Sequence, residues 1–185
     1  MGAAGDICSR ILRRSTSTGL RDLGTLGRQN SFGTGINAAG QVTGYSGNAG
    51  DTAIRAFIST STGLTNLGTL GETSSQGFGI NITGQVTGTS LIPGDATQEP
   101  FVYNGTTLYN INALISPTSG WVLQEGNAIN DSGQITGIGT IDGQYRAFLA
   151  TPVVSPVPEP TSLAMLGVGL LETGAAVQRR RDAAP

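Results

Sequence analysis

The chain has 185 residues, of which 29 are glycine, 5% are aromatic and 12% are charged, and its net charge is −2. The sequence contains no histidine and no lysine, so all ten basic residues are arginine. This composition excludes most histidine-based hydrolase triads and zinc sites, and it excludes lysine Schiff bases and lysine-containing phosphate loops. Low net charge and recurring short apolar runs favour short strands joined by glycine turns over a disordered chain.

The basic residues are concentrated at the two ends of the chain. The body between them carries four: Arg21, Arg28, Arg55 and Arg146. Because affinity for phosphate backbones scales with the number of cations engaged, we expect no nucleic-acid binding. Residues 1–14 contain no apolar stretch of about 7–15 residues, so they are interpreted as an atypical N-terminal segment without a signal peptide. The single cysteine, Cys8, has no internal disulfide partner.

Residues 15–151 are internally repetitive. Residues 15–20 and 23–27 recur at 59–64 and 67–71, which is a spacing of 44 positions (59 minus 15). A looser third copy follows, and the predicted units cover about 15–58, 59–102 and 103–151. Each unit contains an Asn-x-x-Gly frame, which predicts a tight hairpin with a glycine in the left-handed conformation. We therefore predict an all-β fold of antiparallel repeats with about four short strands each, propeller-like and incomplete or open.

The recurring motifs are expected to be turn and core positions rather than ligand contacts. Phe57, Phe101 and Phe148 occupy one place in the unit and are predicted to fill the core between sheets. Trp121 occurs once, in an irregular insertion, where packing is the simpler interpretation. If instead it is exposed, Trp121 or Tyr109 is the candidate platform on which a sugar would stack.

The repeated segments resemble a family of bacterial extracellular repeats called the HAF family. The resemblance rests on residues 22–27, on the frame Gly-Ile-Asn-x-x-Gly-Gln-Val-x-Gly and on residues 56–58, and it covers roughly residues 15–151. It implies an extracellular location, and the family brings no established catalytic residues with it. At residues 11–14 the chain departs from the pattern, because Ile-Leu-Arg-Arg stands where Arg-Ala-Phe-Ile is expected.

The tail after residue 151 differs in composition from the repeats that precede it. Residues 152–160 form a proline-rich linker, and residues 161–185 combine an apolar stretch, predicted to be helical, with a basic end. This tail resembles a PEP-CTERM sorting signal, which implies removal by an exosortase-type membrane enzyme in a Gram-negative bacterium that makes exopolysaccharide. The residues that carry the resemblance are Val157, Pro158, Glu159, Pro160, Arg179, Arg180 and Arg181.

The physical pattern of the tail agrees in outline with that resemblance. An apolar helix followed by cytoplasmic arginines is expected to sit in the inner membrane before processing. Glu172 interrupts the apolar stretch, and a carboxylate at mid-membrane costs about 2.5–3.5 kcal/mol. A sorting tail without a signal peptide leads us to expect that the chain is an N-terminally incomplete copy, with further units upstream.

Three functions follow as hypotheses. The first is a non-enzymatic exported protein of the cell envelope or exopolysaccharide matrix. The second is a carbohydrate-binding, lectin-like module. The third is a glycan-active enzyme, which needs two carboxylates about 5–10 Å apart. The acidic residues between the two ends of the chain are Asp22, Asp51, Glu72, Asp95, Glu99, Glu125, Asp131 and Asp142. The sequence pattern does not predict that any two of them lie close enough to act as a catalytic pair. We therefore expect no enzymatic activity and no cofactor.

Overall fold

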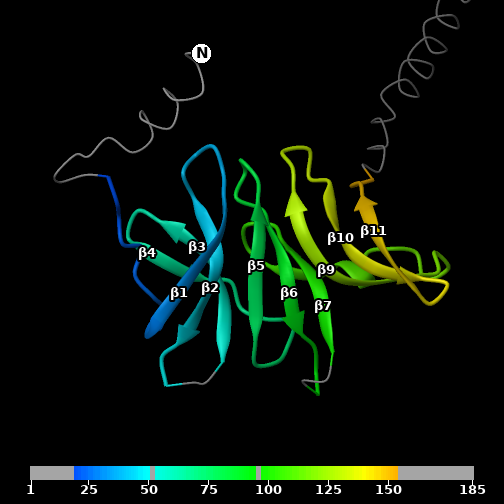
Figure 1. Ribbon diagram of the computed structural model, residues 1–185, viewed down its shortest axis with the longest axis horizontal. Helices are drawn as coiled ribbons and strands as arrows, with labels where there is room; N and C mark the ends of the chain where they lie inside the picture. Colours follow the sequence, from blue (N-terminus) through cyan, green and yellow to red (C-terminus); the bar gives the residue numbers. More distant parts are fainter. Residues whose placement is uncertain (1–18, 51–52, 95–96, 154–185) are drawn as a thin grey trace, which may run out of the picture. The chain divides into compact units, whose positions relative to one another are not determined.

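The computed structural model describes residues 19–50, 53–94 and 97–153, and these residues form three antiparallel sheets (Figure 1). The first sheet contains β1 (Gly27–Ile36), β2 (Val42–Asn48), β3 (Ile54–Thr60) and β4 (Gly63–Asn66). The second contains β5 (Ser75–Ile80), β6 (Val86–Leu91), β7 (Gln98–Tyr103) and β8 (Leu108–Asn110). A short 3-10 helix, η1 (Ile111–Ala113), leads to the third sheet of β9 (Trp121–Ile129), β10 (Ile135–Ile141) and β11 (Gln144–Ala150).

The predicted all-β, antiparallel architecture is confirmed. In each sheet the strands are neighbours in chain order, as in a meander. The described sheets do not close into a propeller, and the third has three strands rather than four. Among the described residues no strand follows β11; Pro152 lacks a backbone donor, and the proline-rich linker begins there. The predicted C-terminal helix lies outside the described residues. Within the described part, no helix is long and apolar enough to cross a bilayer.

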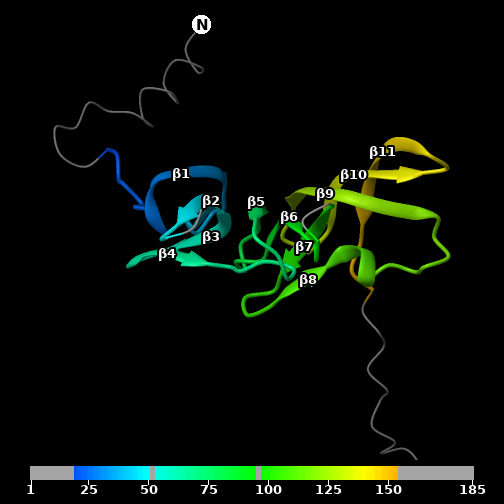
Figure 2. The ribbon, with the colours of Figure 1, turned by 90° about the horizontal axis from the view of Figure 1, so that it is seen from below.

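Each sheet packs face to face with the next through the first strand of the following sheet. Strand β5 lies against β1, β2 and β3, and β9 lies against β5, β6 and β7. Figures 1 and 2 show this order from two directions, with β5 between the first sheet and β6. We call the face that a sheet turns toward the following sheet its trailing face, and the opposite face its leading face.

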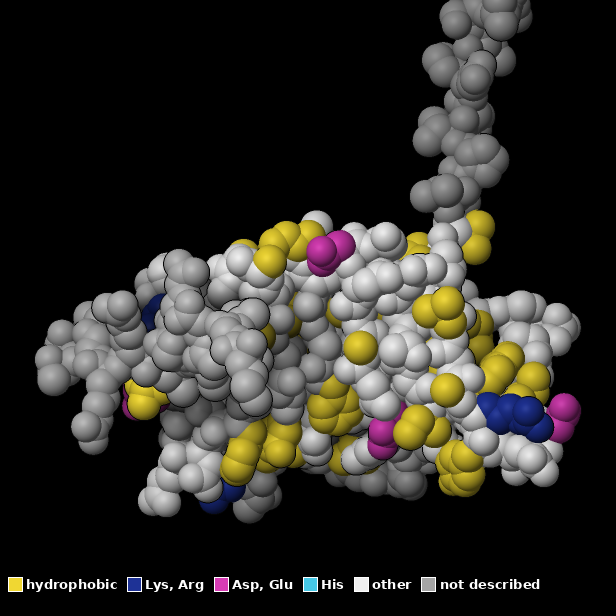
Figure 3. Space-filling view, turned by 45° about the horizontal axis from the view of Figure 1, so that its top comes forward, with side chains coloured by type: hydrophobic (Ala, Val, Ile, Leu, Met, Phe, Trp, Pro, Cys, Tyr) yellow, Lys and Arg dark blue, Asp and Glu magenta, His cyan; other side chains and the backbone are white. Residues whose placement is uncertain are grey.

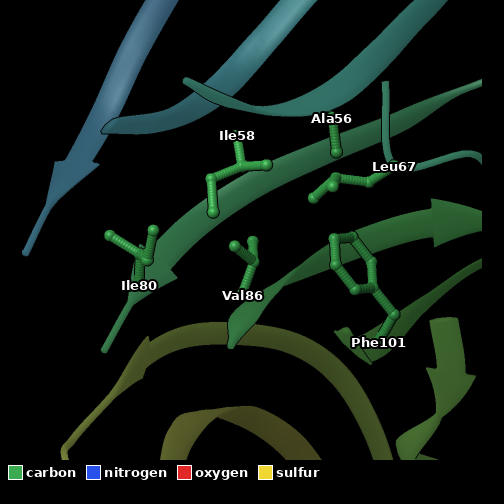
Figure 4. Close-up of a cluster of buried hydrophobic side chains, with 6 residues drawn as sticks. All are labelled: Ala56, Ile58, Leu67, Ile80, Val86 and Phe101. Atoms are coloured by element: carbon green, nitrogen blue, oxygen red, sulfur yellow. The ribbon is translucent and has the colours of Figure 1, made fainter. Parts of the chain in front are cut away.

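Two apolar clusters fill the spaces between the sheets. Between the first and second sheets, Ala56, Ile58 and Leu67 meet Ile80, Val86 and Phe101 (Figure 4). The second cluster joins the second and third sheets and contains Ile111, Leu123, Ile129, Ile135 and Phe148. The recurring phenylalanines are buried, as the sequence predicts, and the phenylalanines of the second and third sheets lie in these clusters.

The Asn-x-x-Gly turns form the predicted tight hairpins. In the first turn, the Gly40 backbone N–H donates to the Asn37 carbonyl at 3.0 Å, and Gly40 has a φ of 75°. Glycine is required because a side chain at that φ is strained. The turns at Asn81 and Asn130 have the same backbone hydrogen bond.

The asparagine side chains do more than close their own turns. Asn37 Nδ2 donates to Gln41 Oε1 at 2.9 Å and to the Asn81 carbonyl at 2.8 Å. Asn81 Nδ2 repeats the pattern, donating to Gln85 Oε1 at 2.7 Å and to the Asn130 carbonyl at 3.1 Å. Three stacked turns are therefore joined into an asparagine ladder that runs from sheet to sheet. The glutamine after each turn glycine orients the amide for this contact.

Replacing Asn81 by alanine is expected to lower the free energy of unfolding by about 2–3 kcal/mol, because buried polar partners lose their hydrogen bonds. The matched control is Asn130→Ala, at an exposed turn whose side chain reaches no further sheet within the described residues; about 1 kcal/mol or less is expected there. Urea unfolding followed by circular dichroism measures both. Equal losses for the two variants would contradict the ladder.

A glycine in the middle of the second strand of each sheet allows the first strand to approach closely. A Cβ added at Gly44, Gly88 or Gly137 would lie 1.8–1.9 Å from a carbonyl oxygen of the neighbouring strand. A register shift in the first strand occurs close to each of these positions. The glycine that ends the Gly-Gln-Val-Thr-Gly motif is thus a packing requirement rather than a ligand position.

Gly88→Ala is expected to destabilise the fold by about 1–3 kcal/mol, since the new methyl group overlaps the Gln76 carbonyl. Gly19→Ala adds the same methyl group where nothing lies within 4 Å, so a change below about 0.5 kcal/mol is expected. Thermal unfolding of the two variants compares these values. A Gly88→Ala protein as stable as Gly19→Ala would show that the close approach is not required.

Candidate functional site

The two aromatic residues singled out by the sequence lie apart in the structure. Trp121 begins β9 and is half-buried, with its ring edge-on to Phe148 at a centroid distance of 6.5 Å. Tyr109 lies on β8, opposite Val102, with 42% of its surface exposed. Trp121 borders a cleft of about 230 Å³ together with Leu123, Phe148 and Leu149, and Tyr109 is not among the residues that line it. The two candidate residues thus lie at separate places, with Trp121 half-buried and Tyr109 exposed.

The first sheet carries an aromatic pair that the sequence analysis missed. Phe32 on β1 lies opposite Tyr45 on β2, and their rings stack with centroids 5.1 Å apart and an interplanar angle of 26°. The pair borders an open cleft of about 730 Å³. Its lining also includes the polar side chains of Arg28, Gln29 and Asn30. An exposed aromatic surface beside guanidinium and amide groups suits a polyhydroxylated ligand.

Of the three described sheets, only the first carries this aromatic pair. In the second sheet the equivalent residues are Gln76 and Thr89, which pair in the same register. The repeat therefore does not need aromatic rings at this place to fold. The sequence did contain a signal for this pair, because Phe32 and Tyr45 both depart from the repeated pattern. A comparison that looks only for residues shared between the units passes over such departures.

Several acidic side chains of the described residues hydrogen-bond within the fold. Asp22 accepts a hydrogen bond from the Gly24 N–H at 2.9 Å, and Asp131 accepts one from the Ile82 N–H at 2.9 Å. Glu99 accepts one from the Asn110 side chain. Within the described part of the chain, no three His, Cys, Asp or Glu side chains are grouped to hold a metal ion. On the face in Figure 3, charged side chains are few and scattered.

The predicted sorting residues, from Val157 to Pro160 and the three arginines at 179–181, lie outside the described residues. Their assignment comes from comparison with known protein families, in which residues 156–181 match the PEP-CTERM protein-sorting motif. The tail is a PEP-CTERM signal. PEP-CTERM signals are processed by exosortase, a membrane enzyme, so the chain is an exported protein and an exosortase substrate.

The PEP-CTERM match covers the tail and not the sheets. No curated protein and no solved structure matches the chain. The comparisons bring no family for residues 15–151, so the resemblance of the repeats to the HAF family stays a prediction.

Trp121→Ala is expected to destabilise the protein by about 1–3 kcal/mol, because the half-buried ring packs on the second apolar cluster. Tyr109→Ala removes an aromatic ring of comparable size from a more exposed position, and about 1 kcal/mol or less is expected. Chemical unfolding measures both. A loss for Tyr109→Ala as large as that for Trp121→Ala would contradict the packing role of Trp121.

Proposed function

We propose that the protein is a non-enzymatic scaffold of the cell envelope or exopolysaccharide matrix of a Gram-negative bacterium, delivered there by its PEP-CTERM tail. The observation that carries this proposal is that the repeated polar side chains form hydrogen bonds within the fold. The asparagines and glutamines of the Asn-x-x-Gly-Gln frame hydrogen-bond within their turn and to the next turn. The recurring residues thus hold sheets together, as a scaffold requires.

The chemistry of the chain supports the same proposal. Histidine and lysine are missing, and several carboxylates of the described sheets are engaged by backbone N–H groups. Carboxylates fixed in this way are poorly placed to act as an acid and base pair on a glycosidic bond. A scaffold needs neither a nucleophile nor a metal.

Export and sorting are tested in an exosortase-bearing bacterium that expresses the full chain behind a Sec signal peptide. Replacing Pro158, Glu159 and Pro160 together by alanine is expected to leave unprocessed protein in the inner-membrane fraction, whereas the parent reaches the envelope or medium in a shortened form. Ser162→Ala, a nearby change outside the Pro-Glu-Pro sequence, is the matched control. Processing of the triple variant at the parental level would exclude recognition through this motif.

Glycan binding is the second candidate function, and the cleft beside Phe32 and Tyr45 favours it. The stacked rings offer a flat apolar surface, and Arg28, Gln29 and Asn30 offer hydrogen-bond donors at its edge. Trp121 and Tyr109 form no such stacked pair, because Trp121 is half-buried with its ring edge-on to Phe148 and Tyr109 lies on β8.

Binding of neutral and acidic exopolysaccharide fragments is measured by isothermal titration calorimetry. Phe32→Ala is expected to weaken binding about tenfold, because a stacking contact is worth up to about 1.5 kcal/mol. Tyr109→Ala, an exposed aromatic change outside the cleft, is expected to leave the affinity unchanged. The glycan role is excluded if the parent protein shows no heat of binding at millimolar fragment.

A further inference from the structure

We propose that the protein associates head to tail, with the trailing face of the third sheet accepting the first sheet of a second copy. The contact would repeat the one that already joins the first sheet to the second and the second to the third. Both halves of that contact lie exposed at the two ends of the described sheets.

The trailing face of the third sheet is built like the covered faces. Thr43, Thr87 and Thr136 occupy one position in the repeat, and each donates its hydroxyl to the carbonyl of the recurring phenylalanine at 2.8–2.9 Å. Thr43 and Thr87 are fully buried beneath the next sheet, whereas Thr136 is exposed. Leu149 is 67% exposed, whereas its counterpart in the first sheet, Ile58, is 9% exposed.

The third sheet carries several exposed apolar side chains. Figure 3 shows several yellow side chains toward the right-hand end, among others spread over the rest of this face. The exposed apolar residues on β9, β10 and β11 are Val122, Ile138, Tyr145 and Leu149. By the strand register these four residues lie on one face of the sheet, and exposed apolar surface of this kind marks an interaction site.

The leading face of the first sheet carries the matching half. Ile36 is 70% exposed, whereas its counterparts Ile80 and Ile129 are each 8% exposed and lie in the two apolar clusters. Gly33 is exposed, whereas its counterparts are buried against a threonine of the preceding sheet. A Cβ at Gly77 would lie 2.5 Å from the Thr43 hydroxyl, so glycine at this position is what allows the sheets to meet.

The described residues give the third sheet no fourth strand, and a segment at the start of the described chain corresponds to one. Residues 19–22 read Gly-Leu-Arg-Asp and correspond to β4, which reads Gly-Leu-Thr-Asn 44 positions later (63 minus 19). In the described structure they pair with no strand, and Leu20 is 95% exposed. The Arg21 side chain does contact the Thr60 and Ser61 carbonyls, at 3.3 and 3.2 Å.

This segment already has the local conformation of its counterparts. Asp22 Oδ1 accepts the N–H two residues later at 2.9 Å, as Asn66 does at 2.8 Å and Asn110 does at 2.9 Å. Asn66 and Asn110 each lie opposite the recurring phenylalanine of the neighbouring strand. The same register places Asp22 of the second copy opposite Phe148, on the edge of β11 that pairs with no described strand.

The asparagine ladder continues across the same junction. Asn130 Nδ2 donates to Gln134 Oε1 at 2.8 Å, and among the described residues it has no acceptor in a further turn. The Asn37 carbonyl accepts from Gly40, whereas the equivalent Asn81 carbonyl accepts from Gly84 and also from Asn37. Docking would therefore pair Asn130 with the Asn37 carbonyl of the second copy. Such a contact is heterologous, so it closes a ring or propagates.

Sedimentation equilibrium of the full chain at about 1–100 µM tests the proposal. The parent is expected to show at least twice the monomer mass of 18.8 kDa. Leu149→Asp and Ile36→Asp, both at exposed positions, are each expected to be monomeric with an unchanged circular dichroism spectrum. Leu114→Asp, at a similarly exposed leucine outside both faces, should associate like the parent.

Mixing the two disrupted variants distinguishes head-to-tail contact from any other association. Each keeps one intact face, so an equimolar mixture is expected to form 1:1 dimers and nothing larger. On association, hydrogen exchange at residues 19–22 should slow. Thr136→Arg on the trailing face and Gly33→Ala on the leading face form a second pair of disrupted variants, and the same results are expected for them. A monomeric parent at 100 µM, single variants that associate like the parent, or a mixture that stays monomeric would overturn the proposal.

Discussion

The side-chain amides of Asn37 and Asn81 are the contacts on which the arrangement of the sheets depends. Each asparagine closes its own turn through Oδ1 and reaches the carbonyl of the next turn through Nδ2. Both asparagines are buried, so an unpaired amide there would be costly. The turns therefore fix how one sheet follows another, while the apolar clusters fill the space between them. Few large side chains are needed, which accords with the low aromatic content.

The architecture could be predicted from the sequence to the extent that local chemistry determines it. The Asn-x-x-Gly frame specified the hairpins because glycine alone adopts the required φ cheaply, and alternating residues specified antiparallel strands. The recurring Asn and Gln were assigned to turns, but their contact with the following turn was not foreseen. That contact joins residues 44 positions apart (Asn37 and Asn81), and no local pattern encodes its direction.

The candidate site shows where sequence reasoning stops. Trp121 stood out because it is the single tryptophan, and its ring packs against Phe148, in line with the simpler of the two interpretations that the sequence left open. Phe32 and Tyr45 were hidden, because each is unremarkable alone and they become a pair only through the β1–β2 register. The three-strand count of the third sheet among the described residues was equally hidden, since a unit of full length need not contain all the strands of its sheet. The sorting signal in the tail, in contrast, is a contiguous stretch of sequence, so it could be identified without knowledge of the fold.

Hydrogen exchange of the asparagine side-chain amides, followed by NMR, is the most direct test of the ladder. The Nδ2 protons of Asn37 and Asn81 are predicted to exchange slowly, because each group donates to two acceptors and is buried. The Nδ2 protons of Asn130 are predicted to exchange much faster in the monomer. Equally fast exchange at all three asparagines would contradict the account.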